Sequence, residues 1–132
     1  MKRPIHILCV VFTALVPPTA ETGNAAEHHV RLFESGKEGY RRYRIPSLVV
    51  MNSGTLLAVC EGRRDGGGLT GNVDLVAKRS RDNGKTWGPL IPIADMNHDT
   101  VGNQAVLVDP VTGTIWIAHT ISPGNESEAA IT

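Results

Sequence analysis

The apolar residues of this chain fall into short runs that are rich in β-branched side chains and are bounded by Gly, Pro, Asn or Asp. No stretch repeats its apolar residues with the period of an amphipathic helix, so the pattern favours strands. The sequence therefore predicts an all-β fold. Strands are expected near residues 31–33, 47–51, 55–60, 73–80, 90–94, 104–108 and 114–119.

Two similar strand–turn–strand units follow one another along the chain. The turn Asn52-Ser53-Gly54 leads into Thr55, and the turn over residues 109–113 leads into Thr114. Four antiparallel strands in about 40–60 residues are typical of a β-propeller blade, although a β-sandwich has similar spacing. The first blade is expected over residues 44–94 and the second begins at Asn103, which makes about one and a half blades.

Charge and glycine content narrow the class of protein. The chain has 13 Lys and Arg residues and 13 Asp and Glu residues, with 14 Gly and 8 Pro among its 132 residues. Nucleic-acid-binding proteins carry an excess of Lys and Arg, and so do polybasic proteins of the membrane surface. The zero net charge of this chain therefore argues against both classes. The many turn-forming residues suit short strands.

The first 26 residues have the plan of a secretory signal peptide. Lys2 and Arg3 precede an apolar run over residues 5–16, Pro17-Pro18 ends it, and Ala25 and Ala26 offer a cleavage site. The run is shorter than the roughly 20 residues that span a bilayer. A buried first helix is the alternative. We expect an exported protein, periplasmic or secreted, with a mature chain of residues 27–132 that has no membrane span and no internal disulfide.

One eight-residue segment matches the pattern Ser-x-Asp-x-Gly-x-Thr-Trp. Its fixed positions are Ser80, Asp82, Gly84, Thr86 and Trp87. The Ser and Asp side chains can bond nearby backbone N–H groups, the Gly can take a left-handed conformation, and the Trp can pack at the base of a hairpin. The segment resembles the Asp box of the sialidases. In that family the box closes the hairpin between the third and fourth strands of a blade and lies away from the active site, so it implies a structural role.

Three further segments resemble sialidase motifs in order and spacing. They are Tyr43-Arg44-Ile45-Pro46, Glu61-Gly62-Arg63, and Thr100-Val101-Gly102-Asn103 with Gln104 where the family usually has Pro. The resemblance covers residues 30 to about 119. It implies that residues 27–132 form the N-terminal part of a six-bladed exo-α-sialidase propeller. That enzyme class hydrolyses terminal α-linked sialic acids with retention, through a tyrosyl intermediate. The tyrosine and two further arginines of the family lie in later blades, so we expect this chain alone to be inactive.

The resemblance implies roles for individual residues. Arg44 is the first of three arginines that bind the sialic acid carboxylate, for which a guanidinium fork is better suited than a lysine. The backbone before Pro46 is expected to be extended and to aim Arg44 inward. Arg63 is expected to contact the sugar ring near its 4-position, or alternatively to pair with Glu61 or Asp65 at the end of a strand. Asn103 is expected to line the pocket, or to serve as a turn residue.

The general acid/base residue is the main departure from the family. The family's aspartate would fall at Leu69, which cannot transfer a proton. Asp65, on the same glycine-rich loop, is the candidate replacement, and a turn or ion-pair role is the alternative. His98 and His119 are isolated and lack the spacing of metal ligands, so neither a metal site nor a cofactor is indicated.

Two other functions compete with the sialidase hypothesis. The first is a noncatalytic Asp-box propeller that binds glycans or a protein, which the loss of the acid at Leu69 favours. The second is a related exported glycosidase with a different sugar specificity. The carboxylate-binding motif at Arg44 favours an enzyme that acts on sialylated glycans, glycoproteins or glycolipids, with no nucleic-acid partner.

Overall fold

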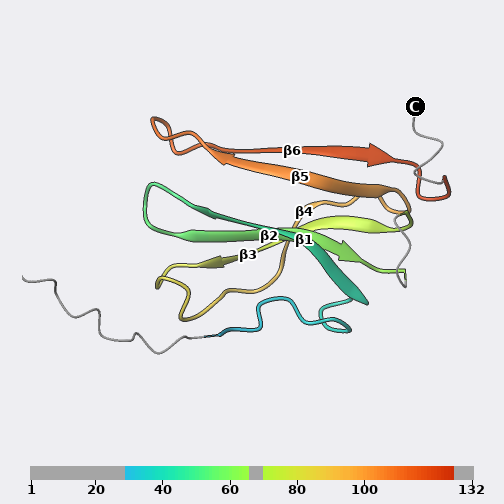
Figure 1. Cartoon of the computed structure of the whole chain (residues 1–132), viewed down its shortest axis with the longest axis horizontal. Helices are drawn as coiled ribbons and strands as arrows, with labels where there is room; N and C mark the ends of the chain where they lie inside the picture. The colour runs from blue at the N-terminus through green and yellow to red at the C-terminus, as the bar shows by residue number, and fades with distance from the viewer. Residues whose placement is uncertain (1–28, 66–69, 127–132) are drawn as a thin grey trace, which may run out of the picture.

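The computed structural model describes residues 29–65 and 70–126, and this part of the chain is all-β, as predicted (Figure 1). The predicted signal peptide lies outside the described residues. The strands are β1 (Arg42–Val50), β2 (Leu56–Arg63), β3 (Val73–Ser80), β4 (Ile91–Ala94), β5 (Thr100–Val108) and β6 (Ile115–Ser122).

The strands form one antiparallel meander followed by one hairpin. β1, β2, β3 and β4 pair in chain order, and β5 pairs with β6. The two units are joined by a short parallel contact of β3 with β5, where Val73 lies opposite Thr100. The described chain thus contains the predicted four-stranded first unit and the first two strands of a second unit.

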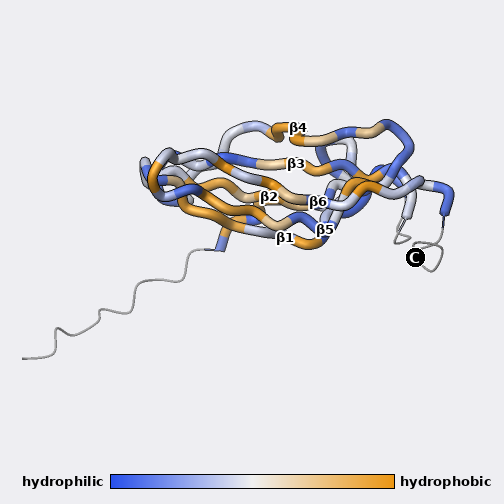
Figure 2. The backbone as a smooth tube through the Cα atoms, turned by 90° about the horizontal axis from the view of Figure 1, so that it is seen from above, coloured by the Kyte–Doolittle hydropathy of each residue, from blue (hydrophilic) through white to orange (hydrophobic). Residues whose placement is uncertain are grey.

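A hydrophobic core joins the two units. Leu57, Val59 and Ala77 are buried in the first unit, and Val49, Val106, Ile115 and Ile117 pack against them. The side chains of β2 are almost all buried because this strand lies inside the sheet with both faces covered, whereas β1 and β6 alternate between more and less exposed residues. In Figure 2 the more apolar stretches of the backbone follow the strands, and the loops at their ends are more hydrophilic.

A second core lies on the opposite face of the first unit. Tyr40, Cys60 and Val76 are buried there, with Phe33, Tyr43 and Leu90 packed against them. Burial raises the pKa of the free Cys60 thiol to about 12, so this thiol stays protonated at neutral pH.

The strand predicted near residues 31–33 is wrong, because this segment crosses the face of the sheet and does not run along an edge. Phe33 packs on that face, with its ring centroid 5.3 Å from that of Tyr43 and 5.7 Å from the Lys78 ammonium. Strand pairing requires the free N–H and C=O groups of a sheet edge, which a sheet face does not offer.

The two hairpins are also connected at their turns. Asn52 Nδ2, between β1 and β2, donates a hydrogen bond of 2.9 Å to the carbonyl of Pro110, between β5 and β6. On the outer side of the second hairpin, Leu107 and Trp116 lie opposite one another and are 64% and 62% exposed. Such an exposed apolar face is typical of a sheet that packs against a further element. None of the described residues belongs to a helix that is long and apolar enough to cross a membrane.

Candidate functional site

Three of the predicted site residues meet in one pocket. Arg44 comes from β1, Arg63 from β2 and Asn103 from β5. The pocket has a volume of about 80 Å³. It is lined by Arg44, Ile45, Glu61, Arg63, Thr100, Gly102 and Asn103.

A bulge in β1 determines the direction of Arg44. Arg44 lies opposite Glu61 and Ser47 lies opposite Val59, so two residues of β1 face a single residue of β2. Ile45, inside the bulge, has a φ of 54°, in the left-handed region that β-branched residues rarely adopt. The extended conformation predicted for this motif is therefore wrong at Ile45, because Ile45 lies inside the bulge and takes a positive φ there.

A second bulge, in β5, places Asn103 in the pocket. Gly102 lies opposite Thr120 and Ala105 lies opposite Ala118, which leaves one extra residue on β5. Asn103 has a φ of 52°, a conformation that asparagine tolerates better than most residues. Asn103 is thus a bulge residue and a pocket residue at once.

Glu61 and Arg63 form a buried ion pair beside these bulges. Glu61 Oε2 accepts hydrogen bonds from Arg63 Nη2 at 2.6 Å and from Nε at 3.2 Å, and the two side chains are 4% and 6% exposed. The other carboxylate oxygen, Oε1, accepts a bond of 3.0 Å from the backbone N–H of Asn103. Arg63 therefore has the ion pair of its structural interpretation and also lines the pocket, while its contact with a sugar stays a prediction.

The sequence motifs assigned no role to Gly102, and to Glu61 only the alternative of pairing with Arg63, which the structure shows. The spacing of Glu61 and Arg63 does predict their contact. Residues two apart on a strand point to the same face, which places Glu61 beside Arg63. Gly102 leaves space for the carboxylate, since a Cβ at this position would lie 2.5 Å from Glu61 Oε1. That contact joins strands that are distant in the sequence, so it could not be anticipated.

Arg44 carries the uncompensated charge of the pocket. Its side chain is exposed, and within residues 29–65 and 70–126 no carboxylate forms an ion pair with it. The charge of Arg63 is balanced by Glu61. The pocket therefore combines one neutralised arginine with one accessible arginine, which makes it suitable for an anion.

Asp65 does not line this pocket. Its Oδ2 accepts a hydrogen bond of 3.1 Å from the backbone N–H of Asn72, across the base of the loop that it begins. Leu69 and the glycines of the loop lie outside the described residues. Asp65 thus has the loop-closing contact of its structural interpretation, and its acid/base role remains a prediction.

A buried cluster on the opposite face of the sheet holds the start of the same loop. Asp74 Oδ2 accepts bonds from the Tyr40 hydroxyl at 2.6 Å and from Arg64 Nε at 3.0 Å, and Asp74 is 0% exposed. The Arg64 guanidinium also lies 4.7 Å from the centre of the Tyr40 ring. Arg63 and Arg64 therefore project to opposite faces, and only Arg63 enters the pocket.

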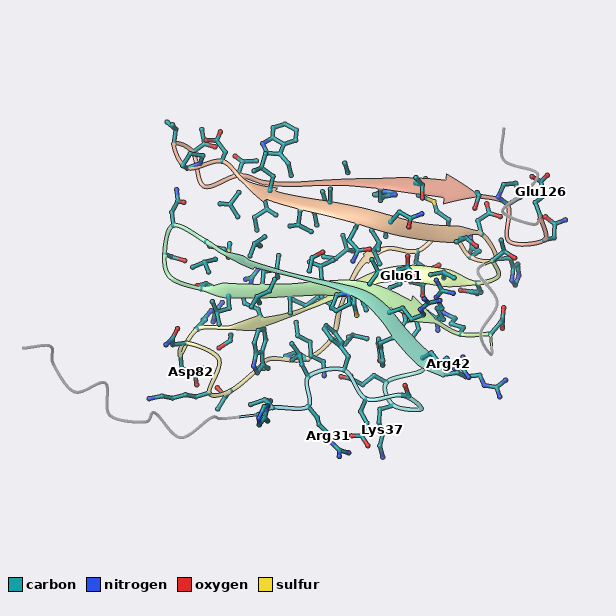
Figure 3. The ribbon with its side chains drawn as sticks, in the orientation of Figure 1. Arg31, Lys37, Arg42, Glu61, Asp82 and Glu126 are labelled. Carbon is teal, nitrogen blue, oxygen red and sulfur yellow. The ribbon has the colours of Figure 1, made fainter. Side chains whose placement is uncertain are left out.

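The turn at the far end of β3 has the contacts predicted for Ser80, Asp82 and Gly84. Ser80 Oγ accepts a bond of 2.9 Å from Gly84 N, and Gly84 has a φ of 85°. Asp82 accepts bonds from the backbone N–H and the hydroxyl of Thr86, at 2.9 and 2.5 Å. Trp87 Nε1 donates to the Gly84 carbonyl at 3.1 Å. Figure 3 shows Asp82 at the opposite end of the sheet from Arg42, so this turn lies away from the pocket.

The hydrogen bonds of this turn make its stability pH-dependent. The bonds from Thr86, and then the one from Ser80, lower the pKa of Asp82 to about 2, below the value of about 3.9 for an unfolded aspartate. The stabilisation is therefore present above about pH 4 and is lost as the pH falls towards 2. We expect Asp82→Asn to have a lower free energy of unfolding than the parent at neutral pH. The difference should become smaller as the pH falls from about 4 towards 2. Urea unfolding from pH 5 to pH 2 measures it, and a difference that stayed constant with pH would contradict the assignment.

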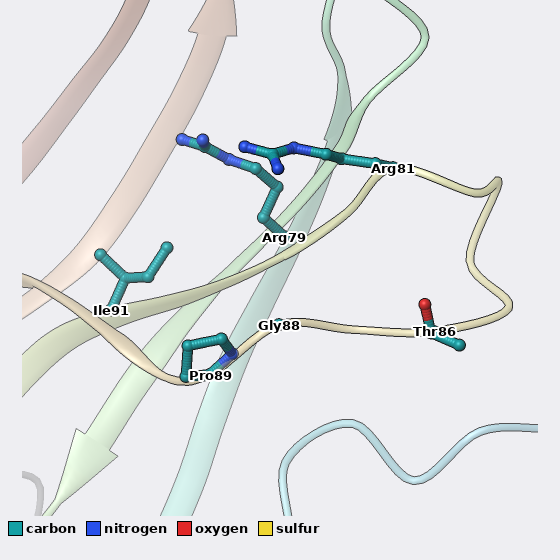
Figure 4. A pocket seen from close by; sticks show the side chains of 6 residues that line it. All are labelled: Arg79, Arg81, Thr86, Gly88, Pro89 and Ile91. Atoms are coloured by element: carbon teal, nitrogen blue, oxygen red, sulfur yellow. The ribbon is translucent and has the colours of Figure 1, made fainter.

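A larger hollow, of about 290 Å³, lies beside this turn (Figure 4). It is lined by Arg79, Arg81, Thr86, Gly88, Pro89 and Ile91. None of the motif residues of the smaller pocket reaches it. We therefore place the candidate site at the smaller pocket, where three separate motifs converge.

The chain is similar in sequence to several sialidases. It is 33% identical over 124 residues to a sialidase of Bacteroides fragilis, and 35% identical over 113 residues to a sialidase of Micromonospora viridifaciens. It is also 30% identical over 124 residues to an exo-alpha-sialidase of Arthroderma benhamiae. These alignments cover 80% to 86% of this chain and 17% to 30% of the relatives, so the chain spans less than a third of the length of each. No protein-family model matches the chain.

The fold is similar to part of a solved sialidase structure. The structure of Hadza microbial sialidase Hz136 matches with a TM-score of 0.63 and 34% sequence identity. The match covers 70% of this chain and 20% of that one. The predicted propeller architecture, present here in part, is confirmed by this likeness.

Proposed function

The chain belongs to the sialidase family, and we propose that it supplies the part of an exo-α-sialidase that holds the carboxylate of a terminal α-linked sialic acid. The observation that carries the proposal is the charge of the pocket. Arg44 is exposed there and forms no ion pair with any described residue, whereas Arg63 is paired with Glu61. A planar carboxylate can take both N–H groups of one guanidinium edge, and this arginine cannot lose its proton.

The remaining pocket residues would contact the sugar ring. Arg63 is held by Glu61 at the side of the pocket, where it can donate to ring hydroxyls near the 4-position of a sugar whose carboxylate lies on Arg44. Asn103 also lines the pocket, and its side-chain amide, whose Nδ2 lies 3.4 Å from Thr120 Oγ1, is suited to a hydroxyl or an N-acetyl group. Because hydroxyl and amide contacts are directional, they orient the ring against the charged group.

Proton transfer is assigned to Asp65 in this proposal. Glycoside hydrolysis needs a carboxyl group that protonates the leaving oxygen and later activates water. Asp65 would have to move towards the pocket when substrate binds, because it does not line the pocket in the present arrangement, where its Oδ2 accepts the Asn72 N–H. The same hydrogen bond, together with Leu69, favours the second candidate function, a propeller that binds sialylated glycans without cleaving them.

Two substrates distinguish these functions in the intact protein. We expect Asp65→Ala to reduce kcat/KM for a natural sialoside by much of the 10²- to 10⁴-fold, roughly, that general acid catalysis supplies. An aryl sialoside should lose far less, since its leaving group departs as an anion. The assay measures release of free sialic acid from both substrates, and Asp99→Ala is a control at an aspartate outside the pocket lining.

Two outcomes would lead to another conclusion. Small and equal losses on both substrates would make Asp65 a loop-closing residue only. A parent protein that binds sialic acid but releases none, and that becomes active as Leu69→Asp, would be a binding propeller that lacks its acid.

The location and partners belong to the same proposal. An exported protein with this pocket would encounter terminal sialic acids on glycoproteins and glycolipids outside the cytoplasm. The signal-like residues 1–26 support the export of the protein.

A further inference from the structure

The bulges of β1 and β5 occupy equivalent positions in the two hairpins. Each contains a non-glycine residue with a positive φ, Ile45 in β1 and Asn103 in β5. Pro46 follows the first of these residues and Gln104 follows the second. A residue in this conformation is costly unless its surroundings hold it in place. The question is therefore what holds each bulge.

Each bulge is held by a side chain from the other hairpin. Glu61, of the first hairpin, accepts the N–H of Asn103. Gln104, of the second hairpin, donates its side-chain amide to the carbonyl of Ile45. Gln104 is only 7% exposed and Glu61 only 3%, so the side chain that makes each bond is buried, although Ile45 and Asn103 are themselves exposed. We call these two hydrogen bonds the reciprocal brace.

We propose that Gln104 is a positioning residue for Arg44, which acts through the carbonyl of Ile45; this inference rests on the proposed function. Gln104 does not line the pocket, so it has no direct contact to offer a ligand. Arg44 immediately precedes Ile45, and the peptide groups of a bulge determine where the preceding side chain points. A proline at position 104 has no amide to donate, so the brace depends on the glutamine that this chain carries there.

The brace predicts a specific pattern of losses. Gln104→Met keeps the length of the side chain and removes the donor, so Arg44 should lose its fixed direction while remaining in the protein. In the intact protein we expect KM for an aryl sialoside to rise about 10-fold with kcat close to that of the parent, because a small misplacement of a binding group weakens substrate binding. Gln104→Glu, which replaces the donor with an acceptor, should behave in the same way and is the second variant if Gln104→Met folds poorly.

Asn52 provides a matched control. Its side-chain amide also donates to a backbone carbonyl across the two hairpins, but at the turns and away from the pocket. Asn52→Ala should reduce thermal stability as Gln104→Met does and leave KM unchanged. A role of Gln104 in stability alone would give the two variants the same kinetics.

A double-mutant cycle and one spectroscopic readout complete the test. In an Arg44→Ala background, Gln104→Met should raise KM no further, because the two residues act as one unit. In addition, the side-chain Nε–Hε NMR signal of Arg44 should shift in Gln104→Met and stay in place in Asn52→Ala, whether or not the protein cleaves a sialoside. Additive losses in the cycle, or an Arg44 signal that stays unmoved, would overturn the inference. If the parent protein had no affinity for sialosides but the Arg44 signal still shifted in Gln104→Met, the proposed function would be wrong and the positioning of Arg44 by Gln104 would stand.

Discussion

Replacing Arg44 with alanine is expected to produce the largest loss of function in this chain. The change removes the accessible guanidinium of the pocket, and the buried ion pair of Arg63 with Glu61 cannot replace its charge. Loss of a bidentate contact to a carboxylate costs on the order of 2–5 kcal/mol, so kcat/KM for a sialoside should fall by roughly 30-fold to several thousand-fold. Steady-state kinetics of the intact protein, or calorimetric binding of free sialic acid, measures this effect.

The controls separate charge from geometry. Arg44→Lys should recover only part of the loss, because an ammonium group does not reproduce the two parallel N–H donors. Arg42→Ala removes an exposed arginine of the same strand that does not line the pocket, and it should change little. The methyl ester of sialic acid, which has no carboxylate charge, should bind parent and Arg44→Ala equally weakly. An unchanged kcat/KM in folded Arg44→Ala would exclude the carboxylate role.

Replacing Glu61 with alanine is expected to produce the largest loss of stability. The change leaves the buried Arg63 guanidinium without its carboxylate and removes the acceptor of the Asn103 N–H. Breaking a buried ion pair by removing one partner typically costs about 3–5 kcal/mol, much more than breaking a pair at the surface. Urea unfolding of parent and variant measures the difference.

Two variants serve as comparisons for this loss. Glu38→Ala breaks the more exposed pair with Lys78, in which the Glu38 side chain is 33% exposed, and should cost below about 1 kcal/mol. Gly102→Ala should reproduce part of the Glu61→Ala effect, because its Cβ would meet the same carboxylate. If Glu61→Ala were no less stable than Glu38→Ala, the buried Glu61 carboxylate would not stabilise the fold in the way proposed here.

The strand order and the site motifs could be read from the chain because they depend on local patterns. Alternating β-branched residues and Gly-containing turns gave β3 at residues 73–80 with the bounds that the structure has. The same pattern wrongly predicted a strand at residues 31–33. Phe33 packs against Tyr43 on a face of the sheet, so its apolar side chain is covered without strand pairing. The pattern of apolar residues predicts which side chains are buried, but it does not show whether a segment pairs at the edge of a sheet or packs on its face.

The candidate site was predictable as residue types but not as an arrangement. Motif spacing selected Arg44, Arg63 and Asn103, and all three meet in the pocket. Nothing in their spacing indicates that Ile45 takes a positive φ or that Gln104 bonds its carbonyl, because both depend on a second hairpin placed against the first.

Local sequence thus decides which segments become strands, where the turns form and which side chains are available for an anion, since these properties depend on residues that are near neighbours along the chain. The spacing of Glu61 and Arg63 on one strand places them side by side, but only the tertiary structure decides that this pair is buried and neutralised whereas Arg44 stays exposed and unpaired. That difference arises from one carboxylate, Glu61, which is held between its own strand and the Asn103 N–H of the second unit. Such a contact joins residues about 40 positions apart, and its energy depends on burial that exists only after the two units have packed.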